Sequence, residues 1–390
     1  MKANHSVMVD TGCVKLMCTL VDHQDIEIRN TCIYCVSNFA SNPNNHQLLL
    51  NEGILPKLIG FLSVNDKYAQ LRAVAALRGL STDADIRLDI VESNAIDPLL
   101  KLAKSDDVEV QMETLACLCN LSLCGCIGDN PLSFLQAVDV QNLIAFLCSA
   151  DSTYRLFGAV ALGNIVSAIK LQDKVITGGA LTPLVTVANE ADLETQRCIA
   201  YALCNLAADP RRRVDIVREG GLPPLIAMAC SQDTTDQLAA IATIRGICAQ
   251  AENRRQVMLS NVQEALSVAA RADDIEVRCE AASVLNALSI NDDNKLDMAK
   301  NDVMLLILVD LLKVDDPRCL RQVMGCIANL SERIECHTYL RRHSFHTSVV
   351  EYFHHNDIAL VREATRFITN LSSVHENHPS ICGGGGIPGL

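Results

Sequence analysis

The 390-residue sequence predicts an all-α protein built as a solenoid of stacked helices, and three observations support this prediction. A short apolar pattern recurs at steps of 41 to 44 residues along the whole chain. Each copy carries the same turn residues between helical segments. The composition is 49% hydrophobic but only 4% aromatic, so the core must consist mainly of aliphatic side chains, which suits helix-on-helix packing. A period of about 40 to 47 residues in helical sequence indicates an α-solenoid.

The recurring pattern ends at one position, which we call the anchor. The nine anchors are Asn38, Gly79, Asn120, Asn164, Asn205, Gly246, Ala287, Asn329 and Asn370. The residue two before each anchor is aliphatic, as in Val36 and Leu77, and the residue after it is apolar. At 100° per residue these positions share one face of a helix, which is therefore the core face. A single copy cannot bury that face alone, so neighbouring copies must stack.

Each copy divides into three helical segments, as residues 209–249 illustrate. A polar first segment, Arg211–Arg218, ends at Gly220, which supplies the positive φ that terminates a helix. The second segment begins at Leu222, and Pro223 fits its first turn because the N–H it lacks would be unpaired there. The third and longest segment runs from about Thr235 to Ala249. Acidic residues recur at the start of the third segments, where they complement the helix dipole.

These features resemble the armadillo repeat, which has a short first helix, a second helix opening with Gly-x-x-Pro-Leu and a long third helix ending in Ala-Leu-x-Asn-Leu. The resemblance covers essentially the whole chain. It implies a right-handed superhelix of about nine three-helix repeats plus a partial tenth, forming a single solenoid over residues 1–390. The predicted repeats are 1–41, 42–82, 83–123, 124–167, 168–208, 209–249, 250–290, 291–332, 333–373 and the partial 374–390. The final residues, from Cys382 on, read as the opening of another second helix, so we expect a longer protein.

Composition excludes several classes of function. The formal net charge of −13 argues against a nucleic-acid binder, which needs a basic surface. No apolar run of 18 residues exists, so no membrane insertion is expected. The sequence has no Gly-rich phosphate loop, no G-x-S-x-G and no H-E-x-x-H. We therefore expect no catalytic residues, no cofactor, no metal and no small-molecule substrate.

Cysteine and histidine leave alternatives open. The 18 cysteines are expected to be reduced, and several, such as Cys35 and Cys326, replace alanine as small core residues. A cluster at Cys117, Cys119, Cys124 and Cys126 is either core filler or a site for a metal or a reactive thiol. Seven of the ten histidines fall between His337 and His378, either at solvated helix ends or as metal ligands. The run Arg211 to Arg213 is either a solvated turn or a nuclear-localisation signal.

Binding is expected on the face that the core does not use. We call this the anchor face: the anchor and the positions one, four and eight before it. In armadillo proteins the anchor asparagines bind the backbone of an extended peptide in a concave groove. The resemblance implies that role for Asn38, Asn120, Asn164, Asn205, Asn329 and Asn370. The alternative is that each asparagine bonds locally at its helix end.

The anchor face is basic although the protein is acidic. It includes no Asp or Glu and six arginines, Arg78, Arg197, Arg245, Arg321, Arg362 and Arg366. Such a face favours an acidic peptide or helix as the partner, because arginine pairs well with carboxylates. The alternative is that scattered arginines only keep the groove soluble.

The sequence therefore predicts a non-enzymatic scaffold or adaptor that resembles beta-catenin, plakoglobin and the vacuolar and axonemal armadillo proteins. The alternative is a nuclear import adaptor resembling importin-alpha, which places Trp four residues before the anchor. The present chain has no Trp, and the corresponding residues include Tyr34, Tyr201 and Arg366. Tyr201 completes the predicted groove. The expected location is the cytoplasm, with the nucleus and the cytoskeleton as alternatives.

Overall fold

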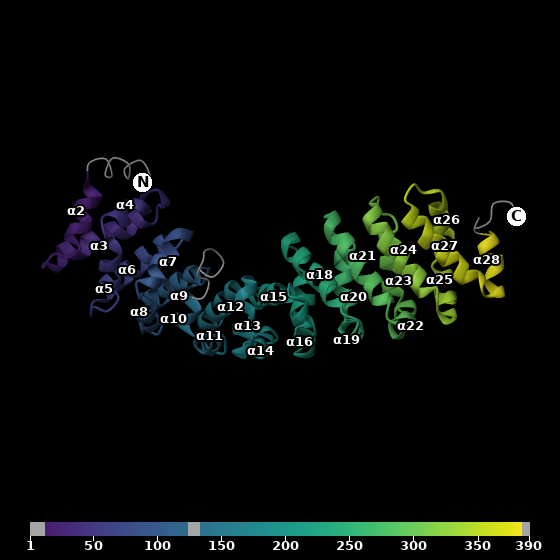
Figure 1. Ribbon diagram of the computed structural model, residues 1–390, viewed down its shortest axis with the longest axis horizontal. Coiled ribbons are helices and arrows are strands. Elements are labelled where there is room, and N and C mark those ends of the chain that lie inside the picture. Colours follow the sequence, from purple (N-terminus) through teal and green to yellow (C-terminus); the bar gives the residue numbers. More distant parts are fainter. Residues whose placement is uncertain (1–11, 124–132, 384–390) are drawn as a thin grey trace. The chain divides into compact units, whose positions relative to one another are not determined.

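The computed structural model describes residues 12–123 and 133–383, and the regular structure in these ranges is entirely helical (Figure 1). The all-α prediction is confirmed. Contacts divide the chain into two compact units, Met1–Ala202 and Leu203–Leu390, so that the division falls within one helix, α15. We call them unit 1 and unit 2. None of the described helices is long and apolar enough to cross a membrane.

Three kinds of helix alternate along the chain. The long third helices are α3 (Ile26–Ala40), α6 (Lys67–Leu80), α9 (Val108–Ser122), α12 (Ser152–Ser167), α15 (Leu193–Ala207), α18 (Thr234–Cys248), α21 (Ile275–Ser289), α24 (Pro317–Leu330) and α27 (Ile358–Ser372). The second helices are α2 (Cys13–Leu20), α5 (Ile54–Phe61), α8 (Ile96–Leu102), α11 (Val140–Leu147), α14 (Leu181–Ala188), α17 (Leu222–Ala229), α20 (Val262–Ala269), α23 (Asp302–Leu311) and α26 (Phe345–Val350). The first helices are α4 (His46–Asn51), α7 (Ala84–Glu92), α10 (Ser133–Val138), α13 (Ile169–Thr177), α16 (Arg213–Arg218), α19 (Asn253–Leu259), α22 (Asp292–Lys300), α25 (His337–Arg342) and α28 (His378–Gly383).

Stacked third helices form the core of each unit. In unit 1, α3 packs on α6, α6 on α9 and α9 on α12; in unit 2, α18, α21, α24 and α27 follow one another in the same way (Figure 1). The aliphatic residues two before the anchor, such as Leu77 and Leu285, are fully buried. Because each helix buries its core face only against its neighbours, stacking rather than any single repeat generates the core.

An aspartate caps the third helices at their N-termini. It stands thirteen residues before every anchor, and its carboxylate accepts hydrogen bonds from backbone N–H groups two or three residues later. These residues are Asp25, Asp66, Asp107, Asp151, Asp192, Asp233, Asp274, Asp316 and Asp357. The caps satisfy N–H groups that have no partner inside the helix and set the start of each third helix.

The turn before most second helices contains a residue with positive φ. Glycine provides it at Gly53, Gly179 and Gly220, with φ of 68°, 83° and 89°. Where glycine is missing, Asn94 and Asn261 adopt φ of 60°. Asparagine tolerates this region better than most residues, so the turn survives the substitution.

Polar side chains of the first helices bind the last carbonyls of the preceding third helices. His46 lies 2.8 Å from the Ala40 carbonyl through Nε2, and His337 lies 2.8 Å from the Ser331 carbonyl in the same way. Arg213 donates to the Ala207 carbonyl at 2.8 Å. Other residues in this role are Asn45, Arg87, Gln172, Asn253, Arg254, Asn294, Asn377 and His378. These contacts satisfy helix C-termini that would otherwise be unpaired.

Candidate functional site

The amides of four anchor asparagines, Asn120, Asn164, Asn329 and Asn370, bind the preceding repeat. Nδ2 of Asn120 donates to the Arg78 carbonyl at 3.4 Å and to Ser81 Oγ at 3.1 Å. Asn164 and Asn370 repeat this arrangement on the preceding third helix, with Ser122 and Ser331 as the hydroxyl partners at 2.8 and 3.0 Å. The partner of these amides is therefore the preceding repeat and not the asparagine's own helix end, which was one alternative from the sequence. In Asn120 and Asn370 the side-chain N–H groups are engaged, so a ligand would meet the Oδ1 atom.

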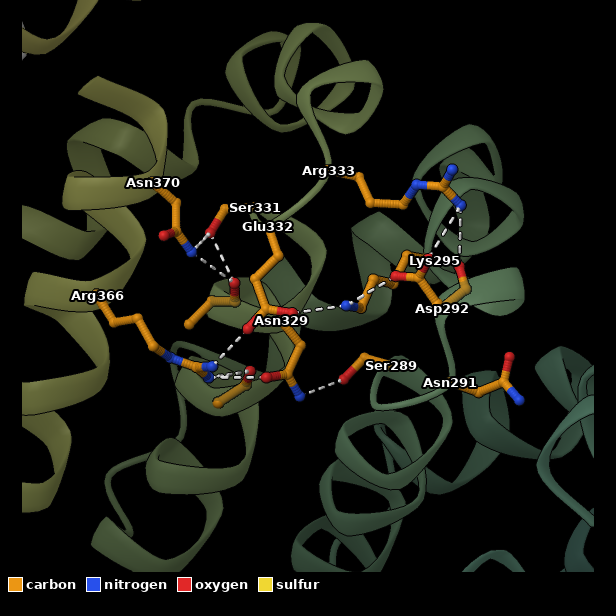
Figure 2. Close-up of polar contacts among 12 residues, drawn as sticks. Ser289, Asn291, Asp292, Lys295, Asn329, Ser331, Glu332, Arg333, Arg366 and Asn370 are labelled. Carbon is orange, nitrogen blue, oxygen red and sulfur yellow. Dashed lines mark hydrogen bonds and ion pairs between the residues drawn. The ribbon is translucent and has the colours of Figure 1, made fainter. Parts of the chain in front are cut away.

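Asn329 shows a variant of the same contact. Its Nδ2 donates to Ser289 Oγ at 2.9 Å and to Asn286 Oδ1 at 3.2 Å, while its Oδ1 accepts from Arg366 at 2.7 Å. Figure 2 shows the Asn329 and Arg366 side chains pointing toward one another. Both functional atoms of Asn329 are thus used inside unit 2.

Contacts in the structure explain why three of the anchors are not asparagine. A Cβ on Gly79 would lie 2.5 Å from the Ala40 carbonyl oxygen, so α6 can approach α3 only with glycine there. At Gly246 the Arg213 guanidinium fills the equivalent space and donates to the Gly246 carbonyl at 2.9 Å. Beside Ala287, the Asn286 amide contacts the following repeat instead, where it donates to Gln322 Oε1 on α24 at 2.8 Å. The gaps are therefore places where other groups occupy the anchor position.

Four of the six predicted arginines form ion pairs with acidic residues of neighbouring repeats. Arg78 meets Glu113 at 2.5 Å and Arg321 meets Asp357 at 2.5 Å, while Arg245 pairs with Glu280. Glu113 and Glu280 both lie seven residues before the next anchor, so the Arg78 and Arg245 pairs are the same contact in two places. The hydrogen bond from Arg321 lowers the pKa of Asp357. These pairs neutralise much of the basic character that the sequence suggested.

Arg366 belongs to a larger polar network between repeats of unit 2. Its guanidinium contacts Glu332 at 2.9 Å and Glu363 at 2.6 Å, and Glu332 in turn contacts Lys295 at 2.6 Å (Figure 2). Lys295 also binds Asp292 at 3.1 Å, and this hydrogen bond lowers the pKa of Asp292. The Lys295 side chain is only 8% exposed. A nearly buried cation held by two carboxylates marks this network as structural, since loss of both carboxylates would leave the Lys295 charge unpaired.

The remaining predicted residues differ in their surroundings. Arg362 is exposed, and it makes no ion pair or side-chain hydrogen bond within residues 12–123 and 133–383. Asn38 is also exposed, and its amide makes no hydrogen bond within the described part of the chain. Arg197, Tyr201 and Asn205 have interaction partners. Arg362 and Asn38 are thus the predicted groups most available to a ligand.

A group of exposed residues in unit 1 was not predicted as a unit from the sequence. Tyr34 and Tyr68 are both 41% exposed, Met112 is 49% exposed, and Arg72 lies between the two tyrosine rings. Tyr34 and Met112 occupy anchor-face positions, so the repeat pattern could have identified them as candidate binding residues. Arg72 and Tyr68 stand seven and eleven residues before Gly79, on the neighbouring stripe of α6, and counting only anchor-face positions omits them.

Most of the described cysteines are buried or half-buried, while Cys148 and Cys382 are exposed. Burial raises the pKa of Cys117, Cys119 and Cys326 to about 12, which keeps these thiols protonated and unreactive at neutral pH. All sixteen described cysteines are free thiols. Cys124 and Cys126 lie outside the described residues. Over residues 12–123 and 133–383, no three His, Cys, Asp or Glu side chains gather in a way that could hold a metal ion.

The C-terminal histidines are not all at solvated helix ends, contrary to the first alternative from the sequence. His337 is 3% exposed, and its Nδ1 accepts a hydrogen bond from Asn377 at 2.9 Å. His343 is held at 3.0 Å from Asp302. These rings have structural partners because polar side chains of the first helices recurrently bind the helix before them.

Comparisons with known proteins agree with this architecture. The Armadillo/beta-catenin-like repeat model matches residues 83–123, which is also the range predicted for the third repeat. An engineered protein of solved structure has a TM-score of 0.72 at 24% identity and covers 96% of this chain and 92% of its own. A designed armadillo repeat protein has a TM-score of 0.54 at 23% identity, covering 60% of this chain and 99% of its own.

Natural relatives match over shorter stretches. The chain is 28% identical over 171 residues to vacuolar protein 8 of Saccharomyces cerevisiae, covering 43% of this chain and 29% of that protein. It is 29% identical over 170 residues to the juxtamembrane domain-associated catenin of Caenorhabditis elegans, covering 43% of this chain and 13% of that protein. The matches thus span less than a third of either relative. Together with the repeat period, the stacked third helices and the matched repeat model, they show that this chain folds as an armadillo-repeat solenoid.

Proposed function

We propose that this chain is a non-enzymatic scaffold that binds segments of other proteins on its anchor face. The observation that carries the proposal is the exposure of large side chains there, namely Tyr34 and Met112 in unit 1 and Arg362 in unit 2. Exposed aromatic residues, Met and Arg are enriched where proteins meet. The other polar groups of this face are largely consumed by contacts between repeats, so these few are the ones able to select a partner.

The family relationship supports the same proposal. One relative is named for its association with a juxtamembrane domain, and another, from Arabidopsis thaliana, is named cellulose synthase interactive 2. Both names describe association with another protein. The present chain shares only part of the length of these proteins, so its own partners are to be found by experiment.

Acidic partner segments are the finer part of the proposal. In unit 2, Arg321 pairs with Asp357 at the start of the following third helix, whereas Arg362 lies on α27, the last third helix described, and meets no carboxylate within the described residues. A carboxylate of a partner would meet a solvated but unpaired guanidinium there. We place this binding in the cytoplasm.

The import-adaptor alternative is less compatible with the side chains. Such a function requires aromatic rings that sandwich the lysine stems of a basic cargo. The ring of Tyr34 already faces the Arg72 guanidinium at 4.8 Å from its centroid. A basic cargo would also approach Arg72 and Arg362, which repel it.

A pull-down with quantitative mass spectrometry tests the proposal. Wild-type protein is compared with Met112→Glu and Arg362→Glu, which alter exposed positions of the anchor face. The matched control is Lys300→Glu, which changes an exposed charge at the end of α22, a first helix. Partners are expected to be lost from at least one anchor-face variant and kept by the control. Full recovery by both anchor-face variants, with normal helicity by circular dichroism, would contradict the proposal.

A further inference from the structure

Arg72 is held between two aromatic rings in unit 1. The guanidinium carbon lies 4.8 Å from the centroid of the Tyr34 ring on α3 and 5.1 Å from that of Tyr68 on α6. Tyr68 precedes Arg72 by four residues, which places both side chains on one side of the helix. Each ring attracts the cation through its negative face. The side chain is therefore fixed in position across two adjacent repeats.

The charge of Arg72 is not matched by an acidic residue. In the described part of the chain it makes no ion pair, and its Nε is buried without a hydrogen-bond partner. Arg78, two turns further along the same helix, is by contrast neutralised by Glu113 at 2.5 Å. A guanidinium that is already ordered but has unused donors loses little side-chain entropy when a carboxylate binds it. Arg72 thus has the properties of a prepared carboxylate receptor.

A hollow of about 300 Å³ lies beside Arg72 between α6 and α9. Its apolar lining comes from Leu71, Ala75, Val108 and Met112. Val108 and Met112 are 69% and 49% exposed, and they lie one turn apart on α9. An aliphatic side chain entering the hollow would cover both.

The charged side chains that line the hollow restrict the kind of segment that can bind there. Arg72 supplies an unpaired positive group at one side, while the exposed Glu109 lines another part of the rim. Glu113, which also lines the hollow, is engaged by Arg78. A segment with carboxylates along its whole length would be repelled at Glu109. A segment with one carboxylate near an aliphatic side chain can place the carboxylate at Arg72 and the aliphatic side chain in the hollow, without a second carboxylate beside Glu109.

We propose that Arg72, its two tyrosines and the adjoining hollow form a subsite for a protein segment that carries an Asp or Glu side chain close to an aliphatic side chain. The carboxylate binds the Arg72 guanidinium, and the aliphatic side chain enters the hollow between α6 and α9. This inference rests on the proposed function, because it names the chemistry of the partner at one place beside the anchor-face residues Tyr34 and Met112.

Selection from a phage-displayed random peptide library on the full 390-residue chain tests the subsite. Enriched sequences are expected to carry Asp or Glu within a few residues of Leu, Ile or Met. A synthetic peptide of the most enriched sequence is then titrated by fluorescence anisotropy against wild type, Arg72→Gln, Arg72→Lys and Met112→Glu. Arg72→Gln is expected to weaken binding by about tenfold or more, as loss of a charge-assisted hydrogen bond predicts. Arg72→Lys is expected to restore part of the affinity, and replacing the acidic residue of the peptide by its amide should reproduce the loss.

The outcomes separate this inference from the broader proposal. Enriched peptides without acidic residues, or an affinity unchanged by Arg72→Gln, would overturn the subsite. If Met112→Glu still abolished binding in that case, the anchor face would remain the binding surface with a different specificity. Failure of the library to yield any peptide would overturn the subsite as well. Unaltered helicity and urea midpoints of the variants exclude misfolding as the cause of a loss.

Discussion

At the scale of single residues, several positions that appeared to interrupt the anchor pattern are determined by packing. Gly79 is one of them, because its missing side chain lets α6 lie against the end of α3. Gly325, four residues before its anchor, similarly faces the Asn286 amide, whose oxygen would be 3.1 Å from an added Cβ. Glycine is required at these positions because two neighbouring helices approach closely there. The sequence of one repeat does not reveal that distance.

Replacing Gly79 with alanine should therefore destabilise unit 1. The added Cβ would lie 2.5 Å from a backbone oxygen, and overpacking of this kind costs about 1–3 kcal/mol. Gly60 in α5 is the matched control, because a Cβ there meets nothing within 4 Å. Alanine should be neutral or slightly stabilising at Gly60, since it favours the helix. Urea unfolding followed by circular dichroism gives both values, and equal midpoints for the two variants would refute the explanation.

The anchor asparagines also make different contributions despite their common register. Asn120→Ala removes the hydrogen bonds to the Arg78 carbonyl and to Ser81, and it should lower the free energy of unfolding by about 1 kcal/mol. Asn38→Ala removes no such contact in the described part of the chain and should stay within about 0.5 kcal/mol of wild type. A comparable loss at both positions in urea titrations would show that the contact to the preceding repeat is not what stabilises Asn120.

At the scale of helices and repeats, the sequence predicted the regular features well. The period predicted the third helices, the Gly-Pro turns and the acidic residues at the helix starts, because these depend on local backbone chemistry. Those residues were expected to complement the helix dipole, and the structure shows that the aspartates also cap the helices. The period did not predict which arginines would remain free. Arg78 and Arg362 both belong to the anchor face, but only Arg78 has an acidic neighbour on the next third helix. The described residues hold no third helix after α27, so Arg362 has no such neighbour there, whereas the Arg78 pair depends on which side chains α9 brings beside α6, which the spacing within one repeat does not reveal.

The network around Arg366 yields a prediction at this scale. Arg366→Glu would place a third carboxylate beside Glu332 and Glu363 and remove the bond to Asn329. We expect it to lower the unfolding free energy by about 1–2 kcal/mol, allowing for solvent screening. Arg362→Glu, four residues earlier on α27, lacks these neighbours and should be nearly neutral. Equal urea midpoints for the two variants would contradict the structural role of Arg366, and would make both suitable for binding assays.

At the scale of the whole molecule, the ion pairs and caps make the free energy of unfolding depend on pH. The hydrogen bond from Arg321 lowers the pKa of Asp357 in the folded protein, whereas an unfolded Asp titrates near about 3.9. The unfolded chain therefore takes up the proton first as the pH falls. The stabilisation is complete above pH of about 4 and is lost as the pH falls through the lowered pKa of the folded state.

Asp357→Asn isolates this contribution, because asparagine keeps the helix cap but cannot carry the charge. Urea midpoints of wild type should decline between pH 6 and pH 3 more steeply than those of the variant. A parallel decline in the two proteins would show that Asp357 does not contribute to acid sensitivity. The other capping aspartates provide a shared background in both.

The most direct test of the central claim, that partners bind the anchor face, is hydroxyl-radical footprinting with a partner recovered in the pull-down. Tyr34, Tyr68 and Met112 are 41%, 41% and 49% exposed in unit 1, so each should be oxidised in the free protein. Leu259 on the first helix α19 is 62% exposed and serves as the reference away from that face. If partners bind the anchor face, the partner should protect Tyr34 and Met112 with the adjoining Tyr68 in unit 1, or Arg362 and its neighbours in unit 2, while Leu259 stays reactive. Protection of Leu259 with no change at the anchor face of either unit would contradict that claim.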